Sequence, residues 1–104
     1  MRNIEDKLWQ IKQIVETRGT YHIEKIINIF SIDIRISNYP SSAFCIYVGE
    51  HFCIDYDKDR VYYIDYRLNK SSWGNEQYIF ESWLKQFNIP NIETLLDHLL
   101  VKII

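Results

Sequence analysis

Residues 43–66 have the sequence AFCIYVGEHFCIDYDKDRVYYIDY, which contains three short segments with the composition of β-strands. These segments, 43–48, 51–57 and 61–66, are rich in aromatic and β-branched residues. Gly49-Glu50 separates the first two segments, and Asp57-Lys58-Asp59-Arg60 separates the last two, as tight turns do. The stretch therefore predicts three consecutive antiparallel strands.

A fourth strand is predicted just before this stretch, at 30–37. Apolar and polar residues alternate along it, which is typical of a strand with one buried face. The apolar positions are Phe30, Ile32, Ile34 and Ile36, and the polar positions are Ser31, Asp33, Arg35 and Ser37. The turn-forming residues at 38–42 end the strand.

Helical periodicity flanks the predicted sheet on both sides. Residues 4–18 repeat apolar residues at helical spacing. A second short helix is expected after Thr20, with an inner face of Ile23, Ile26, Ile27 and Phe30, although this β-branched stretch also fits an extended chain. Helical spacing returns at 79–87. The break at 88–91 ends that helix, and Asn91 is placed to cap a last helix.

This order of elements predicts the fold class. Strands that follow one another without intervening helices form an antiparallel meander, so we expect an α+β fold with a sheet of about four strands. The N-terminal and C-terminal helices should pack on one face of that sheet. A chain of 104 residues fits a single domain spanning 1–104.

Composition limits the function classes. The apolar share of 47% is sufficient for a folded core, and a net charge of −2 argues against direct nucleic-acid binding, which requires a basic stripe. The first residues are charged, and no apolar run is long enough to span a bilayer. We therefore expect a cytoplasmic protein without a membrane partner.

Two clusters resemble metal sites without completing them. The stretch Asp55-Tyr56-Asp57-Lys58-Asp59 begins like a calcium-binding loop, but Arg60 and Tyr66 occupy the positions where glycine and a bidentate glutamate are required. Cys45, His51 and Cys53 are three possible ligands where a structural zinc site needs four. We therefore expect no bound metal.

The predicted register also bears on the two cysteines. A turn at Gly49-Glu50 places Val48 opposite His51 and directs Cys45 and Cys53 to opposite faces of the sheet, which excludes a disulfide between them. A longer turn would remove this exclusion.

Catalytic signals are absent from the sequence. There is no nucleophile-elbow or zinc-protease motif, and with three glycines in the chain there is no glycine-rich phosphate loop. General acid–base catalysis by Asp55 together with Asp57 is the remaining catalytic possibility. We expect no enzyme activity and no cofactor.

The strongest functional signal is a combination of tyrosines and carboxylates on neighbouring strands. Tyrosine is favoured at protein interfaces because it offers a large apolar surface and a polar tip at low entropic cost, although it is also a good strand former. Because strand side chains alternate, Tyr62 and Tyr66 must face one side of the sheet while Tyr63 and Asp65 face the other.

The chain resembles the immunity proteins of bacterial toxin systems, including those of contact-dependent growth inhibition. Three stretches carry the resemblance, namely the Asp-rich stretch 52–57, the aromatic stretch 61–66 and the closing helical stretch 92–100. It covers about half of the chain and includes no diagnostic motif. It implies a cytosolic protein that binds one cognate toxin, often a nuclease, and blocks its active site or substrate groove.

The function expected from these signals is inhibition of a basic protein partner, most simply a nuclease toxin. A carboxylate-rich surface suits a groove that is basic because it holds phosphates. The expected partner-binding residues are Glu50, Asp55, Tyr56, Asp57, Asp59, Tyr63, Asp65 and Trp73. The alternatives are a phage-encoded inhibitor of a host nuclease, similar to an anti-CRISPR protein, and a small metal-binding or catalytic domain.

Overall fold

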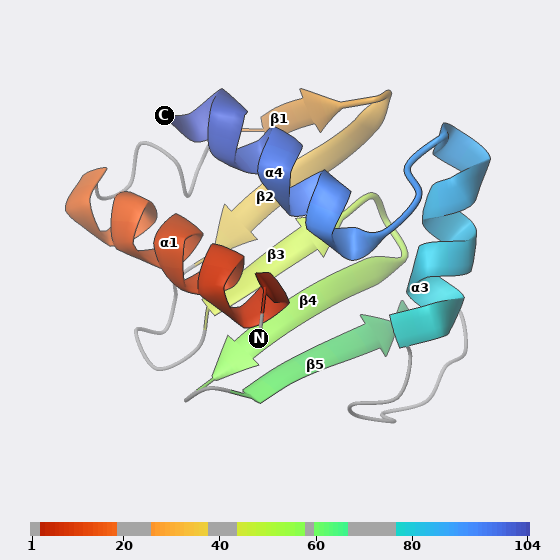
Figure 1. The fold of residues 1–104 in the computed structure, drawn as a ribbon, viewed down its shortest axis with the longest axis horizontal. Helices are drawn as coiled ribbons and strands as arrows, with labels where there is room; N and C mark the ends of the chain where they lie inside the picture. The colour runs from red at the N-terminus through yellow and green to blue at the C-terminus, as the bar shows by residue number, and fades with distance from the viewer. Residues whose placement is uncertain (1–2, 19–25, 38–43, 58–59, 67–76) are drawn as a thin grey trace.

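A computed structural model describes residues 3–18, 26–37, 44–57, 60–66 and 77–104, and its elements carry the labels of Figure 1. The helical elements are α1 (Asn3–Arg18), α3 (Gln77–Leu84), the 3₁₀ turn η2 (Lys85–Phe87) and α4 (Ile92–Ile103). The strands are β1 (Ile26–Ile29), β2 (Ile32–Ser37), β3 (Phe44–Val48), β4 (Phe52–Asp57) and β5 (Arg60–Asp65). The α+β class is confirmed.

The strands form one five-stranded antiparallel sheet in the order β1-β2-β3-β4-β5. Each strand pairs with its neighbour in sequence, so the predicted meander is confirmed with five strands instead of about four. The additional strand is β1, which occupies part of the stretch for which a second short helix was expected.

The helix expected at Ile26 and Ile27 is therefore wrong for the residues that the structure describes. Ile27 and Ile29 are buried while Ile26 and Asn28 are exposed, the alternation of a strand with one covered face. β1 joins β2 through Phe30 and Ser31, whose φ angles of 51° and 69° are those of a tight hairpin turn. Neither turn residue is glycine, so the turn carries no obvious sequence signal.

All three helices of the described chain lie on the same face of the sheet (Figure 1). α1 and α4 lie side by side across it, joined by an ion pair between Lys7 and Asp97, and α3 lies near the end of β5. The expected packing of the terminal helices on one face is confirmed. No helix among the described residues has both the length and the apolar character needed to cross a membrane.

The segment between α3 and α4 follows the predicted break. Asn88 adopts a left-handed conformation (φ 63°) that ends η2, and its N–H donates to the Lys85 carbonyl. Asn91 then caps α4, because its Oδ1 accepts hydrogen bonds from the N–H and the hydroxyl of Thr94, each at 2.8 Å.

The hydrophobic core lies between the helices and the sheet face that they cover. Alternate residues of every strand point into it, including Ile34 and Ile46, which are fully buried. An aromatic cluster closes the core beneath α3, where the Phe52 ring lies 4.9 Å from those of Phe80 and Trp83. None of the described helices covers the opposite face of the sheet.

Candidate functional site

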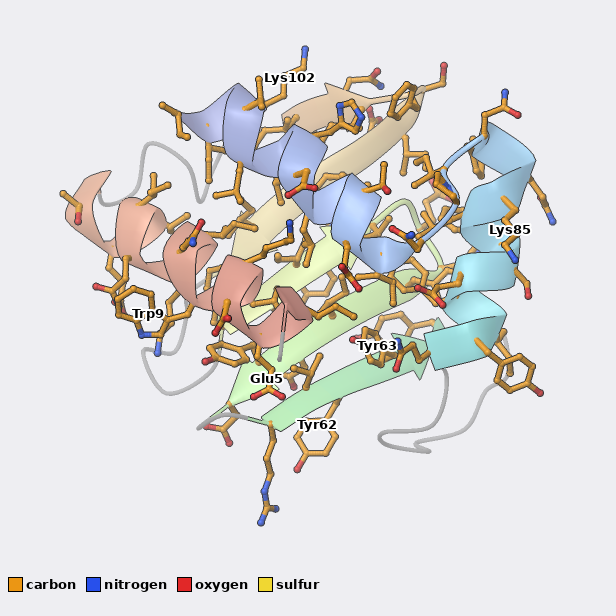
Figure 2. All side chains as sticks on the ribbon, viewed as in Figure 1. Glu5, Trp9, Tyr62, Tyr63, Lys85 and Lys102 are labelled. Carbon is orange, nitrogen blue, oxygen red and sulfur yellow. The ribbon has the colours of Figure 1, made fainter. Side chains whose placement is uncertain are left out.

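The structure separates the predicted partner-binding residues by face. Tyr56, Tyr63 and Asp65 lie on the helix-covered face and are only 5%, 4% and 2% exposed, so they are not available to a partner. Figure 2 shows Tyr63 beside α3 and Tyr62 pointing away from the helices. The prediction that Tyr63 and Asp65 share one face, opposite Tyr62, is confirmed. The burial of Tyr56, Tyr63 and Asp65 argues against them as partner-binding residues.

The other predicted residues remain candidates where they are described. Glu50 and Asp57 are exposed, and Asp55 is half-buried on the face away from the helices. Asp59 and Trp73 lie outside the described residues. Of the four described carboxylates in the prediction, all but Asp65 are at least partly exposed, whereas both described tyrosines are buried. Charge favours the solvent face, whereas tyrosine is stable on either face.

We call the sheet face that none of the described helices covers the outer face. It is formed by the second set of alternating side chains in each strand. Its members are Ile26, Asn28, Asp33, Arg35, Ser37, Cys45, Tyr47, Cys53, Asp55, Asp57, Arg60, Tyr62 and Ile64.

The β3–β4 register differs from the predicted register by one residue. Val48 pairs with Phe52 instead of His51, because the turn contains three residues, Gly49 to His51, instead of two. The shift turns the β4 side chains over relative to β3, so that Cys45 and Cys53 share the outer face as diagonal neighbours. The expectation that they point to opposite faces is therefore wrong.

A chain of side-chain hydrogen bonds runs through these two cysteines. Side-chain hydrogen bonding links the pKa values of Tyr66 and Cys53, of Cys53 and Cys45, and of Cys45 and Asp55. The thiols are free, with Cys45 half-buried and Cys53 only 2% exposed. Four polar groups from β3, β4 and the end of β5 are thereby linked on the outer face.

These contacts shift the acidity of each group. The hydrogen bond from Cys53 lowers the pKa of Cys45, whereas the same bond and burial raise the pKa of Cys53. Burial, together with the nearby thiols, raises the pKa of Tyr66 to about 12. Burial also raises the pKa of Asp55, and its Oδ1 atom has no hydrogen-bond partner among the described residues.

A groove of about 710 Å³ adjoins the outer face at the end of the sheet where the turns of the β1–β2 and β3–β4 hairpins meet α3 and η2. Trp83 and Phe87 line it from the helices, and their ring centroids lie 4.9 Å apart. The hairpin turn contributes Glu50 and His51. Tyr47, Tyr66, Asp33 and Arg35 line it from the outer face and its margin.

Arg35 and Tyr47 form a defined contact inside this groove. The Arg35 guanidinium carbon lies 5.3 Å from the centroid of the Tyr47 ring, a cation–π distance, and the two residues are register partners on β2 and β3. Burial raises the pKa of the Tyr47 hydroxyl, so it stays protonated and able to donate a hydrogen bond at neutral pH. The groove therefore combines aromatic surface with charges of both signs.

Several groove residues were missed by sequence reasoning. The alternation of residues 30–37 already placed Asp33 and Arg35 on the solvent side, and that signal could have identified them. Trp83 and Phe87 belong to the helical spacing predicted at 79–87, and nothing in that spacing shows that they reach the end of the sheet. Tyr66 follows the last paired residue of β5 and is 51% exposed.

Metal binding finds no support in the described residues. No group of three or more His, Cys, Asp or Glu side chains there could hold a metal ion. His51 lies in the β3–β4 turn and lines the groove, whereas Cys45 belongs to the hydrogen-bonded chain on the outer face.

Comparisons with protein-family models, with curated proteins and with solved structures find no match to this chain.

Proposed function

We propose that this protein binds a basic protein partner through its outer face and the adjoining groove, and that the partner is a nuclease whose nucleic-acid groove is blocked by the binding. The observation that carries the proposal is a carboxylate-rich sheet face, left open by the described helices, that continues into an aromatic groove.

The distribution of charge supports a basic partner. The outer face and the groove present the carboxylates Asp33, Glu50, Asp55 and Asp57 against the guanidinium groups of Arg35 and Arg60. A groove that holds phosphates is basic, and opposite charges increase the rate of association and exclude like-charged competitors.

The groove also supplies anchors of the kind that dominate protein interfaces. Tyr47, Tyr66 and Trp83 surround it, and interface energy concentrates in Tyr, Trp and Arg side chains that fill or line a pocket. These residues replace Tyr56 and Tyr63, which lie in the core. A segment of the partner could insert a basic side chain beside Glu50 and an apolar side chain against Trp83. Such a segment would use both the acidic charge and the aromatic surface of the groove.

The resemblance to toxin immunity proteins makes a cognate nuclease toxin the first partner to test. Such an inhibitor acts in the cytoplasm, where its target would meet nucleic acid. A phage-encoded inhibitor of a host nuclease would use the same surface on a different target, and the genes beside this one distinguish the two cases.

The test compares immobilised protein with two charge-reversal variants in a lysate of cells that express the neighbouring genes. Wild type is expected to retain one basic protein with nuclease activity, and to inhibit that activity. Glu50→Lys combined with Asp57→Lys should slow association about tenfold and weaken its salt dependence.

The matched control is Glu16→Lys, an exposed reversal on α1, on the helix side of the molecule. It should leave retention and inhibition unchanged. Equal binding by all three proteins, or equal loss in the Glu16→Lys control, would refute the assignment of this surface.

A further inference from the structure

Cys45 and Cys53 occupy a shared site on the outer face. Cys45 pairs with Asp55 and Cys53 pairs with Tyr47 in the β3–β4 register, so the two cysteines are diagonal neighbours on adjacent strands with side chains on the same face. The two side chains also interact, because hydrogen bonding between them lowers the pKa of Cys45 and raises that of Cys53.

The two thiols differ in access. Cys45 is half-buried and open to a small solute, whereas Cys53 is 2% exposed. A thiolate is the reactive form of cysteine, and a neighbouring hydrogen-bond donor stabilises it. Cys45 receives such a bond from Cys53, and the pKa of Cys45 is lowered as a result.

We infer that Cys45 and Cys53 form a reversible thiol–disulfide site that responds to peroxide, with Cys45 as the attacking thiol and Cys53 as the resolving thiol. The inference concerns the chemistry of the pair itself and does not depend on the proposed protein partner.

The reaction balances in two steps. The Cys45 sulfur attacks hydrogen peroxide, the O–O bond breaks, and the thiol proton leaves with the departing oxygen, giving a Cys45 sulfenic acid and one water. The Cys53 sulfur then attacks the Cys45 sulfur, the S–O bond breaks, and the disulfide forms with release of a second water. The thiols together lose two electrons, and these reduce the peroxide.

The strand geometry favours a reversible disulfide over a permanent one. Diagonal neighbours lie farther apart than directly opposite residues, and a disulfide across a long Cα separation is strained and more readily reduced. A low-molecular-weight thiol should therefore restore the reduced pair.

The experiment is simplified by the sequence, in which these are the two cysteines of the whole chain. Reduced protein is treated with a roughly stoichiometric amount of hydrogen peroxide, alkylated in denaturant and measured by intact mass. Wild type should lose both thiols together, with a mass lower by two hydrogens and no alkylation, and dithiothreitol should reverse the change.

Single variants distinguish the two roles. Cys53→Ser should leave Cys45 trapped as a sulfenic acid that reacts with dimedone, and Cys45→Ser should slow oxidation at least about tenfold because Cys53 is buried. The alkylation rate of Cys45 should also reach half its maximum at a lower pH in wild type than in Cys53→Ala, which has no side-chain hydrogen-bond donor. A purely structural role of Cys53 would not produce this shift.

Two results would overturn the inference. One is accumulation of oxidised Cys45 in wild type while Cys53 can still be alkylated. The other is a product joined exclusively between two chains, detected as a dimer on a non-reducing gel.

Discussion

Gly49 is the residue on which the groove depends most directly. Its φ of 64° is left-handed, a conformation that glycine adopts without steric cost, and it begins the turn that sets the β3–β4 register. Its N–H donates to the Asp33 carbonyl at 2.8 Å, which ties the turn to β2. The Trp83 indole lies directly over the position that a side chain would occupy.

Gly49→Ala should lower the free energy of unfolding by about 1–2 kcal/mol, because it adds backbone strain and a crowded contact. The new Cβ would lie 3.2 Å from Trp83 Cη2 and 3.8 Å from Ile32 Cγ2. Urea unfolding followed by circular dichroism measures the change. Glu50→Ala, the next residue of the same turn, should stay within about 0.5 kcal/mol of wild type.

Asp55 predicts a pH dependence with a definite sign. Because burial raises its pKa, the folded protein holds this proton at a pH where the unfolded chain has released it, and ionisation above that range opposes folding. Asp55→Asn should therefore stabilise the protein at pH 7 by less than about 1 kcal/mol, since the carboxyl is partly in solvent.

The gain from Asp55→Asn should disappear as the pH falls below 3.8, the ordinary pKa of an aspartate, where both chains hold the proton. Denaturant midpoints of wild type and variant across this range test the sign. A variant that is less stable than wild type at neutral pH would contradict it. Glu50→Gln, at an exposed turn position, serves as the control.

At the residue scale, the sequence could predict which strands carry the cysteines but not how they face. Phe52, Cys53 and Ile54 are successive apolar residues, so the hydrophobic pattern fits a turn of two residues or of three equally well. The choice depends on the contact between Gly49 and Trp83, which joins parts of the chain more than thirty positions apart.

In the β1–β2 hairpin, the backbone conformation that the two turn residues prefer conflicts with the conformation that the tertiary structure requires. Phe30 and Ser31 both adopt positive φ without being glycine. The Phe30 ring meets the His98 ring edge-on at a centroid distance of 4.7 Å, so a contact with α4 helps to hold the turn. That contact is invisible in the sequence, which is why the stretch after Thr20 fitted a helix as well as a strand.

Ser31→Gly should stabilise the hairpin by about 0.5–1 kcal/mol, because glycine adopts the left-handed conformation that costs serine energy. Ser31→Ala removes the hydroxyl and keeps the Cβ, so it should give no gain. Thermal or urea unfolding of the two variants separates the backbone effect from the side-chain effect. A loss of stability in Ser31→Gly would show that the turn is not strained.

The described part of the chain forms one layer of helices on one sheet, and the core of these residues lies between the two layers (Figure 1). This arrangement was predictable, because amphipathic helices and alternating strands each have one apolar face to bury. The shape of the groove was not predictable, since it depends on how α3 and η2 pack against the ends of the hairpins.

Substitutions at two adjacent residues of α1 test how this helix packs on the sheet. Leu8 is fully buried against the core, whereas Trp9 is 53% exposed and points away from it in Figure 2. Leu8→Ala should cost about 2–5 kcal/mol and lower the midpoint of one cooperative transition, and Trp9→Ala should cost less than about 1 kcal/mol. Similar costs for both variants, measured by circular dichroism, would contradict this packing.

The meander order of the strands has a kinetic consequence. Every strand pairs with its neighbour in sequence, so the sheet can assemble hairpin by hairpin with short loop closures, whereas the α1–α4 contact joins Lys7 to Asp97 across 90 positions. The helix pair is expected to dock after the folding transition state. Substitutions at that contact should then accelerate unfolding and leave the refolding rate nearly unchanged.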